Sequence, residues 1–126
     1  MTHLDTSVLV DALTGTRRSG PALRALVATG EPIAISALAL YEWLRGPRRD
    51  VEVESQEALL PAARAVPFGS QEATVAATLY RRLPRARTRE CDLSIAACAL
   101  THGARLWTLN PRDFGDVPDL KLFAPN

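Results

Sequence analysis

Cysteine is scarce in this chain of 126 residues, and its scarcity argues against two kinds of stabilising site. The two cysteines, Cys91 and Cys98, are seven positions apart. On a helix they would lie about 10 Å apart along the axis, whereas a disulfide needs Cα atoms within roughly 7 Å. No Cys and His spacing matches a zinc site. The thiols are therefore expected to be reduced and packed, as in a cytoplasmic protein.

Long apolar runs and linkers are also missing. The longest apolar run, near residues 36–44, is too short to span a bilayer, and no signal peptide is expected before Asp5. A membrane partner is therefore not expected. No repeat or low-complexity tract interrupts the chain, so residues 1–126 are predicted to form a single domain. A domain of this length buries roughly two-thirds of the surface that its unfolded chain exposes.

Lysine is almost absent, because fourteen of the fifteen basic residues are arginine and Lys121 is the exception. The net charge is +1, so the molecule carries no strong overall field. The arginines gather at residues 45–49 and 81–89, on either side of an acidic patch at residues 50–57. Arginine forks suit phosphate. The arginine excess could equally reflect genomic base composition, and the second cluster could be a solvated loop or could pair with the acidic patch.

Short apolar runs alternate with helical patterns, which predicts an α/β fold with a mainly parallel sheet. Strands are expected at residues 2–4, 33–36, 65–68, 105–109 and 119–123. Thr6 or Ser7 is expected to cap a first helix that ends at Gly15, and Ser70 to cap a later one. The other helices are expected at residues 21–28, 37–45, 55–64, 70–83 and 90–102, with a helical turn at 111–115.

Acidic residues stand where this fold would bring them together. Asp5 follows the first strand, Glu42 lies in the helix after the second, and Asp92 opens the apolar segment 92–100. Asn110 and Asp113 follow the strand at 105–109. Because ligand sites of parallel α/β sheets lie at the carboxyl ends of the strands, these side chains are expected to converge.

Convergent carboxylates need a compensating charge. Two of them about 4 Å apart repel by about 4 kcal/mol at an effective dielectric of about 20. An all-oxygen donor set without His or Cys favours Mg²⁺ or Mn²⁺ over zinc. Such ions activate water and stabilise the oxygens of a phosphoryl displacement, so the pattern predicts a metal-dependent nuclease.

Each acid taken singly also fits an ordinary structural role. Asp5 could cap the first helix, Glu42 could be an exposed helix residue, and Asp92 could interact with a helix macrodipole. Asp113 could be a turn residue. The joint arrangement of the four is what favours a site.

The residues at these positions resemble a known family. The matching segments are residues 4–11 (LDTSVLVD), the helix with Glu42 after residues 35–36, residues 91–99 (CDLSIAACA) and residues 103–114 (GARLWTLNPRDF). In this order and at this length they resemble PIN-domain ribonucleases, specifically VapC-type toxins of bacterial type II toxin–antitoxin pairs.

The resemblance implies a PIN-like three-layer α/β fold with a central five-stranded parallel sheet flanked by helices. It implies an endoribonuclease that depends on Mg²⁺, with Mn²⁺ as a substitute, and hydrolyses phosphodiester bonds of RNA. It also implies a cytoplasmic homodimer and a cognate antitoxin, with which the toxin would form a larger complex.

The resemblance further assigns roles. Asp5 and Asp92 would be the principal metal ligands, Glu42 would complete the acidic set directly or through water, and Ser7 would hydrogen-bond within the site.

The fourth acidic position departs from the family pattern. Many members have an acid where this chain has Asn110, and Asp113 lies three positions further on. Asp113 is therefore expected to be a second-sphere acid or a ligand of a second metal ion. Whether one or two ions bind stays open.

The arginine clusters gain a role from the resemblance. Arg45 and Arg48 extend from the Glu42 helix, and Arg87 and Arg89 lead into Asp92. These four are expected to hold the RNA backbone on either side of the scissile phosphate.

Two alternatives remain from other classes. The first is a catalytically weak PIN-fold module that binds RNA or protein, which Asn110 weakly favours. The second is a phosphatase that forms an aspartyl-phosphate, but that class requires a second Asp where this chain has Ser7.

Overall fold

The computed structural model describes residues 1–125, and its centre is a parallel sheet with the strand order β2-β1-β3-β4. The register pairs Leu4, the last residue of β1, with Trp107, the last residue of β3. Asp5 and Thr108 therefore leave the sheet side by side. The strands are β1 (Thr2–Leu4), β2 (Ile33–Ala34), β3 (Arg105–Trp107) and β4 (Leu122–Phe123).

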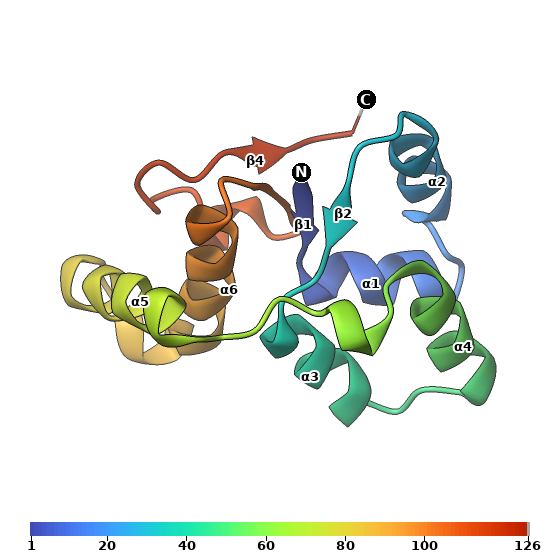
Figure 1. Ribbon diagram of the computed structural model, residues 1–126, viewed down its shortest axis with the longest axis horizontal. Coiled ribbons are helices and arrows are strands. Elements are labelled where there is room, and N and C mark those ends of the chain that lie inside the picture. The colour runs from blue at the N-terminus through green and yellow to red at the C-terminus, as the bar shows by residue number, and fades with distance from the viewer. Residues whose placement is uncertain (126) are drawn as a thin grey trace.

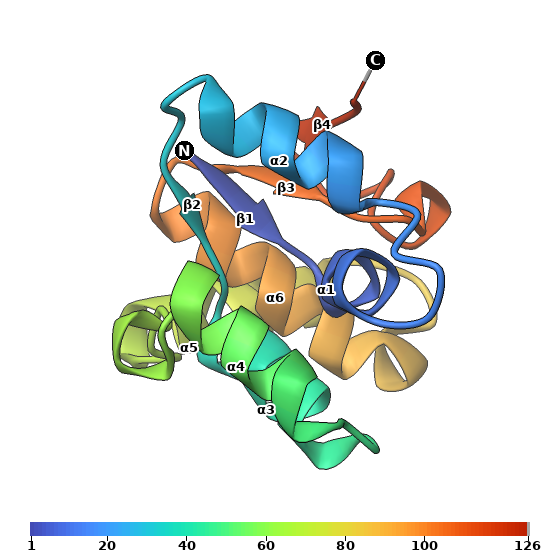
Figure 2. The same ribbon diagram turned by 90° about the vertical axis from the view of Figure 1, so that its right-hand side faces the viewer.

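Helices cover both faces of this sheet. Figures 1 and 2 show α2 over one face, and α6 with α5 beside it over the other. The α-helices are α1 (Thr6–Leu13), α2 (Gly20–Ala28), α3 (Ala37–Arg45), α4 (Asp50–Leu59), α5 (Ser70–Arg82) and α6 (Glu90–Thr101). The 3-10 helices of the described chain are η1 (Ala62–Arg64), η2 (Ala86–Arg89) and η3 (Pro111–Asp113).

The core lies between the sheet and α6. Residues 95–99 of α6 are buried on every side of the helix, because the sheet, α3 and α5 all pack on it. Trp43 of α3, Trp107 of β3 and Phe114 are the largest side chains that are fully buried. This packing fixes the direction of α6 and hence the position of Asp92 in its first turn.

The expected five-stranded sheet is wrong in its strand count, because the described chain forms four strands. The segment expected as a strand at residues 65–68 contributes a single parallel bridge between Ser36 and Val66. Val66 donates to the Ile35 carbonyl at 2.8 Å, but the next residue, Pro67, has no N–H with which to continue the ladder.

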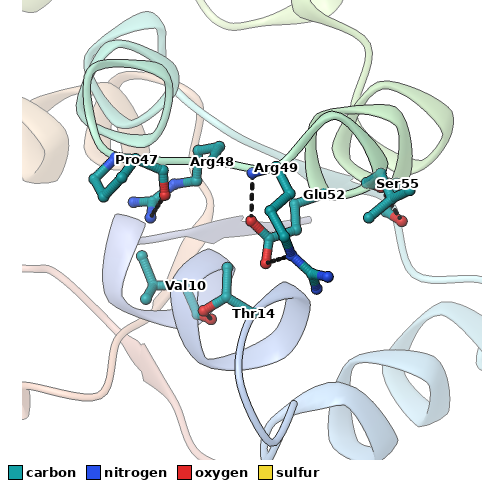
Figure 3. A network of polar contacts seen from close by, with 8 residues as sticks. Val10, Thr14, Pro47, Arg48, Arg49, Glu52 and Ser55 are labelled. Carbon is teal, nitrogen blue, oxygen red and sulfur yellow. Dashed lines mark hydrogen bonds and ion pairs between the residues drawn. The ribbon is translucent and has the colours of Figure 1, made fainter.

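Helix α4 also differs from its prediction, which placed it at residues 55–64. It begins at Asp50, within the segment interpreted as an acidic patch, and ends before Pro61. Figure 3 shows why it begins there: the backbone N–H of Arg49 donates to the Glu52 carboxylate at 2.7 Å, and the Arg49 side chain pairs with the same group. Glu52 therefore stabilises the first turn of its own helix.

The predicted caps of two helices are wrong by one residue. Asp5, and neither Thr6 nor Ser7, occupies the N-cap position of α1, and Gly69 precedes α5 where Ser70 was expected to cap it. The Asp5 side chain makes no capping hydrogen bond, so capping does not explain this acid.

His3 is an unusual residue for the central strand β1. It is 1% exposed, neither of its ring nitrogens has a hydrogen-bond partner in the described residues, and its ring centroid lies 5.7 Å from that of His102. Burial, and then the positive charges of His102 and the N-terminus, lower the pKa of His3 to about 4. The imidazole is therefore neutral in the folded protein at neutral pH.

His3 should make the fold sensitive to acid. In the unfolded chain His3 has a pKa of about 6.5, so below this pH the unfolded chain binds a proton that the folded chain does not bind. The free energy of unfolding therefore falls as the pH drops from about 6.5 to about 4. The loss should approach about 3 kcal/mol, from about 1.4 kcal/mol for each pKa unit. Urea unfolding at several pH values should show a smaller loss in His3→Leu than in the wild type. His102→Gln, a change at an exposed histidine, should keep most of it, and equal pH slopes in all three proteins would contradict the role of His3.

Candidate active site

The Asp5 carboxylate lies at the carboxyl edge of the sheet and is held by two hydroxyl groups. Asp5 is 5% exposed. Its Oδ2 accepts hydrogen bonds from Ser7 Oγ at 2.9 Å and from Thr108 Oγ1 at 2.7 Å. Both donors hold the carboxylate in one orientation, so Oδ1 is the atom left for a ligand.

The same hydroxyls tie the loop after β3 to the end of β1. The Leu109 N–H donates to Ser7 Oγ at 3.0 Å, and the Asn110 N–H donates to Thr108 Oγ1 at 3.0 Å. Ser7 was expected to hydrogen-bond within the site, and it does. Thr108 was not singled out from the sequence, although a hydroxyl residue directly after a buried strand was the available signal.

Glu42 faces this site from α3. Its Oε1 accepts a hydrogen bond from Thr6 Oγ1 at 2.7 Å, and its Oε2 lies 3.6 Å from the Arg45 guanidinium. The Glu42 side chain is 21% exposed, so it is not an ordinary exposed helix residue. Cys91 lies beside it, and burial, followed by the Glu42 charge, raises the pKa of the Cys91 thiol to about 12. This cysteine is therefore a packed thiol and not a nucleophile.

The pKa of Asp92 shows how closely the acidic side chains are placed. It is half-buried, and burial is the largest cause that raises its pKa to about 6. The carboxylates of Asp5, Asp113 and Glu42 raise it further, while Arg89 lowers it. Three of the acids singled out from the sequence, Asp5, Glu42 and Asp113, therefore lie within electrostatic reach of the fourth, Asp92.

Asn110 and Asp113 are exposed and bracket η3. The Asp113 N–H donates to the Asn110 carbonyl at 3.0 Å, as in a tight turn. Both residues stand at the rim of the acidic region, and neither side chain is committed to a hydrogen bond within the described residues. Their ligand roles stay predictions.

The expectation that Arg89 binds RNA is wrong, because its side chain is 9% exposed and fully engaged inside the protein. It donates to both carboxylate oxygens of Asp116, at 2.6 and 2.9 Å. It also donates to the carbonyls of Asp113 at 3.0 Å and Pro84 at 3.1 Å. Arg89 does not pair with the patch at residues 50–57 either, since its carboxylate partner is Asp116. The hydrogen bonds of Arg89 instead connect the turn after η3 to the start of α6.

The other three arginines expected to bind RNA differ in exposure and in their contacts. The Arg48 guanidinium lies over the Trp43 ring at 4.4 Å, its Nε donates to the Trp43 carbonyl at 2.9 Å, and Figure 3 shows a further contact with the Pro47 carbonyl. Arg48 is therefore largely engaged. Arg45 remains 58% exposed beside Glu42, and Arg87 is exposed. Of the four arginines expected to bind RNA, Arg45 and Arg87 are the two whose side chains are exposed to solvent.

The donor set fits a hard divalent cation in its chemistry. It offers carboxylate oxygens, and the Cys91 thiol beside Glu42 keeps its proton because its pKa is raised to about 12, so the set suits Mg²⁺ or Mn²⁺. In residues 1–125, however, no three His, Cys, Asp or Glu side chains are already drawn together as a ready metal cluster. Thr6 and Arg45 hold Glu42, so side-chain movement would accompany ion binding.

Comparison with protein families matches residues 3–120 to the PIN domain. The chain belongs to the PIN-domain family. Ribonuclease VapC19 of Mycobacterium tuberculosis is 33% identical over 123 residues, which cover 96% of this chain and 98% of that protein. The resemblance to VapC-type PIN-domain proteins that the sequence motifs indicated is thereby confirmed.

Solved structures show the same fold. A chain of a toxin–antitoxin complex from Klebsiella pneumoniae superimposes with a TM-score of 0.75 at 24% identity, over 100% of the present chain and 98% of the Klebsiella chain. A chain of DNA-bound VapBC from Salmonella typhimurium gives 0.77 at 18% identity, over 97% and 96%. The α/β PIN fold predicted from the sequence is confirmed apart from the number of strands. No helix within residues 1–125 is long and apolar enough to cross a bilayer.

Proposed function

We propose that this PIN domain is a metal-dependent endoribonuclease that acts as the toxin of a toxin–antitoxin pair. The observation that carries the proposal is the half-buried Asp92 carboxyl, whose pKa is raised to about 6 by burial and by three neighbouring carboxylates. Such crowding is costly in a structural site and is expected where a cation is to be bound.

Asp5 and Asp92 are the proposed ligands of Mg²⁺, for which Mn²⁺ could substitute, with Glu42 bound directly or through water. When bound, such an ion acidifies water and stabilises negative oxygens during displacement at phosphorus. The hydroxyls of Ser7 and Thr108 fix the Asp5 carboxylate before the ion arrives, which lowers the cost of ordering it. Asp113 is the proposed second-sphere acid at the rim.

Other residues are proposed to orient the attacking water and to attract the RNA. Glu42, anchored by Thr6, accepts a hydrogen bond from the attacking water and orients it. Arg45 and Arg87 are exposed cations that attract the RNA phosphates on either side of the acidic region. Their positive charge offsets the repulsion between the phosphates and the carboxylates.

The proposed partners follow from the relatives. The compared solved chains come from complexes of toxin with antitoxin, in one case bound to DNA. We infer a cognate antitoxin for this PIN domain, a homodimer of the toxin, and a cytoplasmic setting in which RNA is available. An apolar hollow of about 280 Å³ between α1, α2 and α4, with Leu13 and Val27 in its wall, is a surface on which an apolar segment of that antitoxin can pack.

The experiment is cleavage of a mixed pool of tRNA, rRNA and mRNA by purified protein with Mn²⁺, with Mg²⁺ and with EDTA. Discrete products that require the metal are expected, and EDTA should reduce their rate by at least about 100-fold. Addition of the inferred cognate antitoxin should suppress cleavage. Products that form equally in EDTA would contradict the proposal.

A second candidate function is an RNA- or protein-binding module with little catalysis. Asn110 favours it, because an amide adds no charge at the position where many family members have an acid. Metal binding without cleavage of any RNA in the pool, by protein shown to be free of antitoxin, would favour this alternative.

A further inference from the structure

A cavity of about 390 Å³ adjoins the candidate active site at the carboxyl ends of β3 and β4. Figure 2 shows α2 passing over β4 where the chain leaves the sheet, and the start of α2 forms one wall of the cavity. Its lining is mostly apolar and includes Ala22, Leu109, Pro111 and Phe123, while Arg18 stands at its edge. Its volume is that of a site for a small ligand.

The cavity and the acidic region share a wall. Thr108 and Leu109 line the cavity, and the same two residues hold the acidic site together. Thr108 Oγ1 donates to Asp5 Oδ2 at 2.7 Å, and the Leu109 N–H donates to Ser7 Oγ at 3.0 Å. The cavity therefore adjoins the acidic region across Thr108 and Leu109.

We propose that this cavity binds one base of the RNA substrate, next to the phosphate that is cut. The inference rests on the proposed function and adds a determinant of sequence preference to it. A base has two apolar faces and a polar edge, which matches apolar walls with a single cation at the rim.

Two side chains at the rim fit this occupant. Leu109 is 43% exposed, and a stacked base would cover it. Arg18 is 81% exposed and contacts Asp11 Oδ1 through one guanidinium nitrogen at 3.3 Å. Its remaining N–H groups are free to donate to a base edge or to a neighbouring phosphate.

The test uses two readouts with the same variants. The first is the cleavage rate of RNAs that carry an abasic nucleotide at each position flanking the cut. The second is the fluorescence of 2-aminopurine placed at the same positions, in complexes with protein in which Asp92→Asn prevents cleavage. Ala22→Phe fills the cavity from α2, and Leu109→Ser removes an apolar wall. Ala58→Phe, on the exposed face of α4, is the matched control.

One flanking position should be sensitive in the wild type. Loss of the base there should slow cleavage on the order of 5- to 100-fold, the range expected when one base stacks on a protein surface. Ala22→Phe and Leu109→Ser should remove this difference between base and abasic RNA, and Ala58→Phe should keep it. Equal cleavage of all the abasic RNAs, or a preference that survives both cavity variants, would overturn the inference.

The second readout separates the two proposals. If no RNA is cleaved, the proposed function fails, and the fluorescence decides the cavity. A change at one position that disappears in Ala22→Phe then supports base binding. No change at any position overturns it.

Discussion

Asp92→Asn is expected to abolish RNA cleavage while making the metal-free protein more stable. An amide keeps the size of the side chain but removes the charge that binds a divalent ion. Cleavage should fall by more than about 100-fold, since even residues that only support a metal ligand typically account for 10- to 100-fold. Cleavage of a defined RNA at saturating Mn²⁺ measures this loss.

The gain in stability follows from the raised pKa of Asp92. Between about pH 4, the ordinary value of an Asp carboxyl, and about pH 6, the folded protein keeps a proton that the unfolded chain has released, so stability falls as the pH rises through this window. Asp92→Asn removes that penalty. Because Asp92 is only half-buried, solvent screening should reduce the gain to roughly 1–2 kcal/mol at pH 8.

The pH dependence provides the control for this gain. At about pH 3, below the ordinary Asp pKa, Asp92 is mostly protonated in both states, so the variant and the wild type should unfold at nearly the same denaturant concentration. Glu54→Gln, which changes an exposed carboxylate of α4, should leave stability and cleavage within experimental error of the wild type. A variant with Asp92→Asn that retained cleavage insensitive to EDTA would exclude the proposed metal role.

The sequence predicted the parts of the fold in which pattern and packing agree. The strand at residues 2–4 and the helices at 37–45 and 90–102 were predicted within one residue of their observed bounds, because their apolar spacing fits one element and Gly or Pro follows the last two. Residues 65–68 were harder, since one apolar pair followed by Pro67 satisfies a strand pattern but makes a single bridge. Ladder formation depends on the neighbouring strand, which local spacing does not describe.

Some residues of the candidate site could be predicted from the sequence, and others could not. The four acids were found because carboxylates beside apolar segments are conspicuous in a sequence. Thr108 was missed, because nothing local distinguishes a hydroxyl that supports an acid 103 positions away from one at the surface. Arg89 was assigned to RNA for a related reason. The sequence does not distinguish Arg89 from its exposed neighbour Arg87. Only the tertiary contact with Asp116 shows that Arg89 is buried and paired within the protein.

Arg89→Met is expected to destabilise the protein more than any other arginine substitution near the site. It removes four hydrogen bonds from one side chain, two of them to the carboxylate oxygens of Asp116. Loss of hydrogen bonds to a charged group typically costs about 1.5–3 kcal/mol each. Asp116 is partly exposed and water can replace part of the contact, so we expect a total loss of about 2–4 kcal/mol in urea unfolding.

Arg87→Met is the matched control, because Arg87 lies two positions earlier and its side chain is exposed. It should leave stability within about 0.5 kcal/mol of the wild type and weaken RNA binding, with a shallower dependence on salt. Arg89→Met should instead change the pH profile of cleavage, because Arg89 lowers the pKa of Asp92. With that cation gone, the rise in activity that follows deprotonation should move to higher pH. Equal stability of the two variants would contradict the inference that the hydrogen bonds of Arg89 hold η3 and α6 together.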